Sequence, residues 1–148
     1  MRFHDVAFFG VTVAWLLTSN PDVPRDVDVL EICSGRTESI AKAGARMGLA
    51  TIGIDRVKNP FFGDLRTVPG WHHLCQQLMR MKANSLIWMA PPCDSFVFCN
   101  AVNHGRSARN PDGDLNCEPT LIGNFFAGLT AFIIACLLYT SPSPRDRG

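Results

Sequence analysis

A chain of 148 residues holds enough material for one packed core, so we expect one main domain. With 14 basic and 13 acidic residues, its net charge of +1 excludes the whole-molecule field of a strongly basic nucleic-acid binder, and any such binding must come from a local patch. The six cysteines show no Cys-x-x-Cys pair and no zinc-ligand spacing, which favours free thiols in a reducing, intracellular compartment and no metal site.

Residues 1–25 are predicted to be a leader or an N-terminal helix ahead of the main domain. Their apolar stretch, VAFFGVTVAWLL (6–17), is shorter than the about 20 residues that cross a bilayer, so we expect no membrane anchor. A signal peptide is disfavoured because the preceding MRFHD is nearly neutral and no small-x-small cleavage site follows.

Three short apolar runs in the chain indicate buried strands. They are VDVLEIC (27–33), LATIGID (49–55) and SLIWMA (85–90). The runs are apolar throughout rather than at every second position, which is typical of parallel strands covered on both faces.

Three segments have the periodicity of helices. They are TESIAKAGARMG (37–48), TVPGWHHLCQQLMRMK (67–82) and TLIGNFFAGLTAFIIA (120–135). Gly48 is expected to end the first helix, and Thr67 to cap the start of the second. Because strands and helices alternate, we predict an α/β domain over residues 26–135 with a doubly wound, mostly parallel, Rossmann-like sheet.

The C-terminal residues 136–148, CLLYTSPSPRDRG, differ in composition from the helical segment before them. A Ser/Pro-rich run predicts a disordered tail. The run also resembles the translation of a transposase-type sequencing adapter, and on that interpretation the natural chain continues past Ala135. We therefore expect the α/β domain to be a truncated fragment, incomplete at its C-terminal side.

Chemically useful side chains fall at or just beyond the predicted strand ends, where doubly wound sheets bind ligands. They are Cys33, Asp55, Asp64 and Cys93. A strand, a glycine turn, a helix and an acid after the next strand form a nucleotide-binding unit, and here Asp55 lies 20 residues past Gly35. The missing GxGxxG pattern disfavours a dinucleotide more than S-adenosylmethionine, which has no phosphate. A purely structural unit would show the same pattern.

The run WMAPPCDSFVF (88–98) carries a predicted strand directly into two prolines. Pro91 and Pro92 donate no backbone hydrogen bond and hold φ near about −65°, so the strand must end before them. Cys93 is therefore presented on a rigid turn at the end of a strand.

With this turn, residues 27–135 resemble the DNA cytosine-5 methyltransferase family in the order and spacing of several motifs. The family's cofactor loop, second-strand acid, Gly-Asp pair and Pro-Pro-Cys turn are matched by Glu31 to Ser39, Asp55, Gly63 with Asp64, and Pro91 to Cys93. The resemblance implies a class I methyltransferase fold that binds S-adenosylmethionine. It also implies a nucleic-acid partner, DNA rather than RNA, and a monomeric nuclear enzyme.

The resemblance also assigns roles to individual residues. The implied cofactor contacts are Glu31, Cys33, Gly35, Thr37, Asp55, Asp64 and Pro91. The implied catalytic residues are Pro92 and Cys93, whose thiolate would add to carbon 6 of a cytosine taken out of the DNA stack. Arg106 and Arg109 match the mobile loop that closes over DNA and would contact phosphates, although a solvated polar loop is the alternative.

The sequence departs from the family at several points. Asp94 stands where the family has Gln, and Thr37 stands where a second turn glycine is common. The Glu-Asn-Val segment that holds the base and the domain that reads DNA have no match, so we expect this chain to be inactive even if its parent is an enzyme. An amino-group methyltransferase is disfavoured because Ala90 and Cys93 replace its polar and aromatic positions. A non-catalytic Rossmann-like fragment or binding module, with Cys93 as a buried structural residue, stays open.

Overall fold

The structure is a computed structural model of the whole chain and describes residues 22–140. The rest, residues 1–21 and 141–148, covers nearly all of the predicted leader and most of the predicted tail, and lies outside the described residues. The predicted domain 26–135 divides into two compact units, one ending at Ala90 and the other beginning at Pro91. Each unit is described by itself below.

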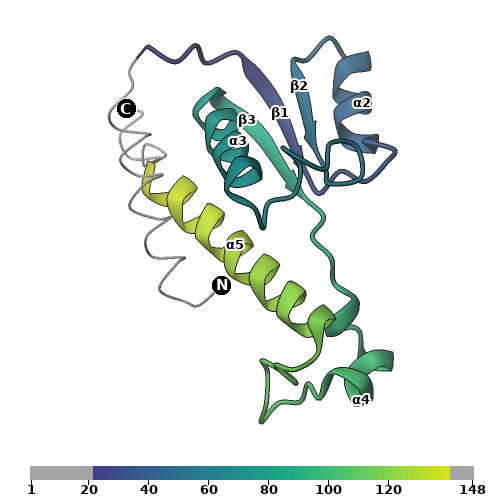
Figure 1. Cartoon of the computed structure of the whole chain (residues 1–148). Helices are drawn as coiled ribbons and strands as arrows, with labels where there is room; N and C mark the ends of the chain where they lie inside the picture. The colour runs from purple at the N-terminus through teal and green to yellow at the C-terminus, as the bar shows by residue number, and fades with distance from the viewer. Residues whose placement is uncertain (1–21, 141–148) are drawn as a thin grey trace. The chain divides into compact units, whose positions relative to one another are not determined.

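The unit that ends at Ala90 is built on a three-stranded parallel sheet (Figure 1). Its strands are β1 (Val27–Ile32), β2 (Thr51–Ile54) and β3 (Met81–Met89), in the order β2-β1-β3. Helix α2 (Ser39–Arg46) connects β1 to β2, and α3 (Val68–Met79) connects β2 to β3. The two crossovers run in opposite directions along the sheet, so right-handed connections place the helices on opposite faces. This is the predicted α/β arrangement, in a small sheet compatible with a Rossmann-like fragment.

The predicted end of α2 at Gly48 is confirmed. Gly48 has φ +80°, the left-handed conformation that glycine adopts readily, and its N–H donates to the carbonyl of Ala45 over 3.0 Å. The helix lies close to the sheet at Gly44, where a Cβ would come within 2.9 Å of the Thr51 side chain. A larger residue at Gly44 would therefore push α2 away from the sheet.

The predicted start of α3 at Thr67 is also confirmed, but its end is not. The Thr67 hydroxyl accepts the N–H of Gly70 over 3.2 Å and donates to the carbonyl of Asp64 over 2.8 Å. The helix was predicted to run to residue 82 and instead ends at Met79. The reason lies far away in the sequence, because the carbonyl of Arg80 accepts the N–H groups of residues 26 and 27 and so joins the sheet.

Strand β3 departs from the predicted pattern of strands covered on both faces. Leu86 and Trp88 are 48% and 47% exposed. The pairing with β1 jumps from Val27–Met81 to Val29–Leu86, and Asn84 between them has φ +63°. This bulge explains why β3 begins four residues before the predicted run at 85–90, since the extra residues are accommodated outside the regular ladder.

The unit that begins at Pro91 is helical. It contains the 3₁₀ turns η1 (Asp94–Phe96) and η2 (Phe98–Asn100), the short helix α4 (Ala101–His104) and the long helix α5 (Glu118–Thr140). The described part of the predicted tail is therefore helical, because α5 runs past residue 135. Phe126, Leu129 and Ile133 form the buried stripe of α5.

Helix α5 is long and apolar enough over Glu118–Ala135 to cross a membrane. Core helices of soluble proteins pass the same test of length and composition. The absence of a membrane partner therefore stays a prediction.

The cap of α3 can be tested by removing one hydroxyl. We expect Thr67→Ala to lower the free energy of unfolding by about 1 kcal/mol, because an N-terminal N–H loses its acceptor. Urea unfolding followed by circular dichroism measures the change. Thr67→Ser keeps the hydroxyl and should restore most of the loss, while Thr37→Ala, at an exposed threonine, is the matched control. Equal effects of Thr67→Ala and Thr37→Ala would contradict the capping role.

Candidate functional site

The turn after β1 is tied to the end of β2 by one hydrogen bond. The N–H of Gly35 donates to Oδ2 of Asp55 over 2.8 Å, so the structure brings these two predicted site residues together. Cys33, Gly35 and Glu38 have φ of 58°, 63° and 46°, which makes the turn sharp. The bond fixes the turn at the carboxyl ends of two parallel strands, where ligands bind in sheets of this kind.

The same turn has unused space and an unused hydroxyl. Apart from Gly35 and its two chain neighbours, no described residue has an atom within 4 Å of the place where a Cβ on Gly35 would stand. The hydroxyl of Ser34 is buried and has no hydrogen-bond partner among the described residues. The exposed Thr37 hydroxyl accepts only from Ser39 over 3.1 Å in the described contacts. The turn can therefore offer a ligand the exposed Thr37 hydroxyl and the open space beside Gly35, while the Ser34 hydroxyl is enclosed.

Glu31 serves the fold rather than an open site. Its side chain is 4% exposed, and Oε2 accepts the N–H of Ala41 in the first turn of α2 over 2.8 Å. A carboxylate in this position satisfies a helix N–H and lies near the positive end of the helix. A cofactor contact through this side chain stays a prediction, and it would compete with the bond to the N–H of Ala41.

Asp55 is half-buried and keeps capacity for a ligand. Its Oδ1 accepts the N–H of Val57 over 2.7 Å, and Oδ2 accepts from Gly35. An ionised carboxylate has about four lone-pair sites, so two donors leave others free. Asp55 also lines a pocket, which is where a further donor could reach it.

This pocket, the β2-end pocket, has a volume of about 250 Å³. It is lined by Glu38, Gly53, Ile54, Asp55, Lys58, Asn59, Phe62, Gly63 and His73. Lys58 forms an ion pair with Glu38, and the rings of Phe62 and His73 lie 5.6 Å apart between centroids. No sequence pattern placed Lys58, Phe62 or His73 at the site. His73 belongs to α3, and no spacing rule relates a residue of α3 to the turn after β2.

The ring proton of His73 can be placed from its neighbours. Arg80 donates from Nη1 to Oε1 of Gln77 over 3.0 Å, which turns the amide nitrogen of Gln77 towards Nδ1 of His73, 3.4 Å away. Nδ1 therefore accepts and Nε2 carries the proton. Burial, followed by the positive charges of Arg80 and His72, lowers the pKa of His73, so the ring is neutral at physiological pH.

Asp64 is committed to Arg66 instead of being free for an adenine amino group. Arg66 donates from Nε over 2.9 Å and from Nη2 over 2.7 Å, and its backbone N–H donates over 3.1 Å. The Arg66 side chain is the main cause that lowers the pKa of Asp64. This bidentate pair uses the carboxylate that the resemblance assigns to the cofactor, and the predicted contact would require Arg66 to move.

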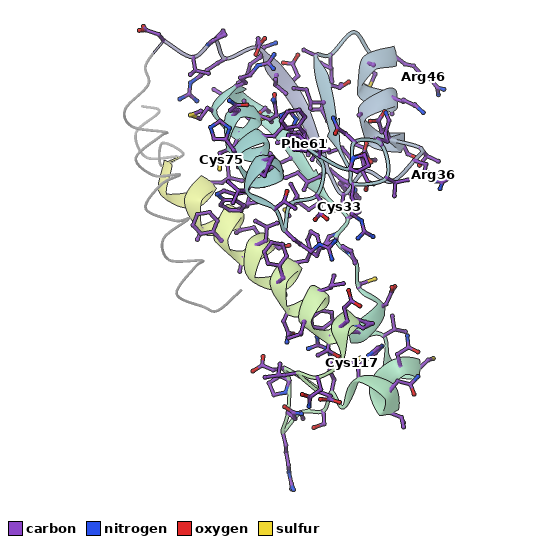
Figure 2. All side chains as sticks on the ribbon, in the orientation of Figure 1. Cys33, Arg36, Arg46, Phe61, Cys75 and Cys117 are labelled. Carbon is purple, nitrogen blue, oxygen red and sulfur yellow. The ribbon has the colours of Figure 1, made fainter. Side chains whose placement is uncertain are left out.

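Cys33 lies at the carboxyl end of β1 as an un-ionised thiol (Figure 2). Burial, and then the negative charge of Asp55, raise the pKa of the Cys33 thiol to about 12. Any contact with a cofactor would therefore be made by a neutral S–H group.

The raised pKa of Cys33 predicts slow alkylation. At about pH 9, the ordinary pKa of a thiol, iodoacetamide should label Cys33 at least tenfold more slowly than the exposed Cys93 and Cys99, because little Cys33 is thiolate. Its rate should keep rising with pH towards 12. Asp55→Asn should speed it by removing the repelling charge. Peptide mass spectrometry gives each rate, and a Cys33 rate equal to that of Cys99 would contradict this environment.

Cys93 is exposed and opens onto a groove of about 400 Å³ within the second unit. The groove, called here the Cys93 groove, is lined by Pro91, Pro92, Cys93, Phe96, Gly123, Phe126, Ala127, Thr130, Ala131 and Ile134. The carbonyl of Cys93 accepts the N–H of Phe96 over 2.8 Å, which starts η1. The alternative of a buried structural Cys93 is therefore wrong. The acids and Cys93 belong to separate units, so their convergence stays a prediction.

Arg106 is an internal residue rather than a free phosphate contact. Its Nη2 donates to Oγ of Ser95 over 2.9 Å, to Oδ1 of Asn124 over 2.8 Å and to the carbonyl of Thr120 over 3.3 Å. The guanidinium carbon lies 3.8 Å from the centre of the Phe96 ring. Nη1 donates to the carbonyl of residue 111, and the buried Nε has no partner among the described residues. The phosphate contact predicted for Arg106 would require the guanidinium to leave these partners, while Arg109 is exposed.

Gly123 allows this network to form. A Cβ on Gly123 would lie 2.2 Å from Oγ of Ser95 and 3.2 Å from Nη2 of Arg106. Only a residue without a side chain lets α5 lie this close to η1. A glycine inside an apolar helix was the available signal, because such a glycine usually has a packing reason.

Arg106 and Arg109 form a natural pair for a stability test. We expect Arg106→Ala to lower the free energy of unfolding by about 2–4 kcal/mol, because several buried acceptors lose a charged donor. Arg109→Ala, at an exposed position, should change it by less than about 0.5 kcal/mol. Urea unfolding measures both. Arg106→Lys should recover only part of the loss, since an ammonium lacks the planar fork. Similar effects of the two alanine variants would refute the internal role.

Comparison with known proteins found no matching family model, no matching curated protein and no matching solved structure. Among residues 22–140, no group of three or more His, Cys, Asp and Glu side chains could hold a metal ion. The site itself therefore carries the functional argument.

Proposed function

We propose that this chain carries the cofactor-binding part of a class I, S-adenosylmethionine-dependent methyltransferase that resembles the DNA cytosine-5 class. The Gly35–Asp55 hydrogen bond is the observation that carries the proposal, because it joins a glycine turn to an acid at the ends of adjacent parallel strands. The strand order β2-β1-β3 supports it, since doubly wound sheets place their first strand centrally. We also propose that these three strands are part of a complete doubly wound sheet.

The charges of the β2-end pocket favour this cofactor over a dinucleotide. Its ionised side chains are those of Glu38, Asp55 and Lys58, and His73 is neutral, so the lining has a net negative charge. Lys58 is already paired with Glu38. A pyrophosphate would find no uncommitted cation among these lining residues, whereas a cationic sulfonium ligand is attracted by the net charge.

Three residues fit the cofactor. Asp55, which lines the β2-end pocket, has lone pairs for ribose hydroxyls. In the adjoining turn, Gly35 has open space beside its backbone, and Ser34 has an enclosed hydroxyl without a described partner, which would have to be uncovered to reach a ligand. The pocket of about 250 Å³ is slightly smaller than the typical range of about 300–1,000 Å³, so it suits the adenosine end alone. When bound, the cofactor supplies the methyl group.

Cys93 is the proposed nucleophile. Its exposed thiol follows two prolines on a stiff turn, which suits a group that must approach a base without moving the chain. Addition of the thiolate to carbon 6 of cytosine makes carbon 5 nucleophilic. Loss of the carbon 5 proton after methyl transfer then lets the thiolate leave. Pro91 and Pro92 hold the turn. Of the two arginines predicted to contact phosphates, we propose that Arg109 does so.

The groove also explains why we expect this chain to be inactive. Its lining offers apolar faces and one side-chain hydroxyl, that of Thr130. The polar edge of a cytosine needs several hydrogen-bond partners. A flipped base in this groove would leave some of its polar groups unpaired, which costs binding free energy. The nuclear location and the DNA partner stay predictions of the resemblance.

A second candidate is a non-catalytic Rossmann-like binding module. It is favoured by the internal use of Glu31, which caps α2, and of Asp64, which pairs with Arg66. This candidate keeps the β2-end pocket as a nucleoside site and gives Cys93 no chemical role.

Calorimetry with S-adenosylmethionine tests the cofactor part of the proposal. The 148-residue chain should bind one equivalent, and Asp55→Asn should weaken binding at least tenfold, because one charged acceptor at the pocket is lost. Asp28→Asn is the matched control. Asp28 also accepts a backbone N–H and pairs with a lysine, but it lies near the amino end of β1, so binding should not change.

Two results would decide against this cofactor. The first is no measurable heat of binding with folded protein. The second is tighter binding of NAD⁺ than of S-adenosylmethionine, which would favour a dinucleotide module.

A further inference from the structure

We propose that Cys117 and His104 form a reactive thiol–imidazole pair that exchanges with small aliphatic disulfides. Nδ1 of His104 lies 3.2 Å from Sγ of Cys117. This pair lies within the second unit and shares no residue with the Cys93 groove. The proposal is independent of methyl transfer and of cofactor binding.

The backbone position of His104 is set by bonds and turns on both sides of it, and burial limits the movement of its ring. His104 is the last residue of α4 and is buried, and Gly105 after it has φ +61°, which ends the helix. The carbonyl of His104 accepts the N–H of Asp114 over 2.7 Å. This bond brings the chain back beside α4 three residues before Cys117. A fixed imidazole next to a thiol is the geometry of nucleophilic cysteine sites.

Cys117 lies at the N-terminal end of the long helix α5 (Figure 2). Its carbonyl accepts the N–H groups of Thr120 and Leu121 over 3.0 and 3.1 Å, so Cys117 occupies the capping position. The N-terminus of a helix carries a partial positive charge that stabilises a negative charge on sulfur. The helix end and the imidazole are two separate sources of the same effect.

Two neighbouring groups strengthen the site. Thr120 is on the same face of α5 one turn further on, is fully buried, and its hydroxyl has no hydrogen-bond partner among the described residues. A hydroxyl of this kind can donate to a charged sulfur. The guanidinium of Arg106 is bonded to the carbonyl of Thr120, which brings a positive charge to the same turn, while the carboxylate of Glu118 is exposed to solvent.

The other described cysteines lack this combination. Cys33 is half-buried beside Asp55, and Cys75 is buried. Cys93 and Cys99 are exposed, and in the described contacts neither has an imidazole at hydrogen-bond distance. Cys117 is half-buried, which leaves part of the residue open to a small reagent.

The proposed exchange is balanced. The Cys117 thiol gives its proton to His104, and its sulfur attacks one sulfur of a small aliphatic disulfide. A new disulfide bond to Cys117 forms as the reagent's disulfide bond breaks, and the leaving thiolate takes the proton from the imidazolium. Cys117 is oxidised, the leaving sulfur is reduced, and one small thiol is released.

The test uses the reduced 148-residue chain and 2-hydroxyethyl disulfide, an uncharged probe. Quenched samples are digested, and mass spectrometry gives the rate of modification at each cysteine. We expect Cys117 to react about tenfold faster than the exposed Cys99 of the same molecules. His104→Asn keeps a polar atom near Nδ1 but cannot take the proton, so it should slow Cys117 at least tenfold and leave Cys99 unchanged. Asn103→Ala, at the exposed neighbouring residue, should change neither rate.

Two outcomes would overturn the proposal. One is a Cys117 rate in the unmodified chain that is equal to or below that of Cys99. The other is an unchanged Cys117 rate in His104→Asn. Folding of the variant is checked by Cys75, which should stay unmodified because it is buried. If Cys75 reacts in the variant, the comparison of Cys117 with Cys99 in the unmodified chain decides alone. Failure of cofactor binding would change none of these rates.

Discussion

The hydrogen bond between the N–H of Gly35 and the carboxylate of Asp55 is the constraint on which the first unit depends. It closes a turn that contains two non-glycine residues with positive φ, a conformation that costs energy unless the surroundings impose it. Burial is the main cause that raises the pKa of the Cys33 thiol, and the negative charge of Asp55 adds to it. One carboxylate thus fixes the shape of the turn, adds to the effect of burial on the nearest sulfur and forms one wall of the β2-end pocket.

The three acids predicted at the site have different surroundings, and these decide what each can do. Glu31 is buried against a helix N–H, and Asp64 is neutralised by a bidentate arginine, so both already have strong partners. Asp55 accepts from two backbone groups and still has lone pairs. A ligand gains the most binding energy from a charged group that still has free lone pairs to accept hydrogen bonds. Asp55 is therefore the acid through which a ligand with hydroxyl groups would be recognised.

The features that could be predicted from the sequence are those that depend on neighbouring residues. The glycine that ends α2 and the threonine that caps α3 act within a few positions of themselves, so local rules find them. The end of α3 depends on a bond from Arg80 to residues more than fifty positions earlier, and no local rule contains it. Arg106 is similar. Its sequence neighbours indicate a polar loop, but the three oxygens that accept from its Nη2 lie 11 to 18 positions away in the sequence.

Arg106 also forms hydrogen bonds close in the sequence to two cysteines of the second unit, Cys93 and Cys117. Through Nη2 it is bonded to Ser95, two residues after Cys93, and to the carbonyl of Thr120, three residues after Cys117. Each thiol precedes the turn that it helps to start, so the guanidinium holds together the η1 turn and the first turn of α5. All its hydrogen-bond partners in this network are neutral oxygens, and its charge is therefore uncompensated by any of them. A half-buried positive charge between two helical N-termini loses part of its hydration, and negative charge that develops nearby offsets this cost. That is the condition that a thiolate on either turn would satisfy.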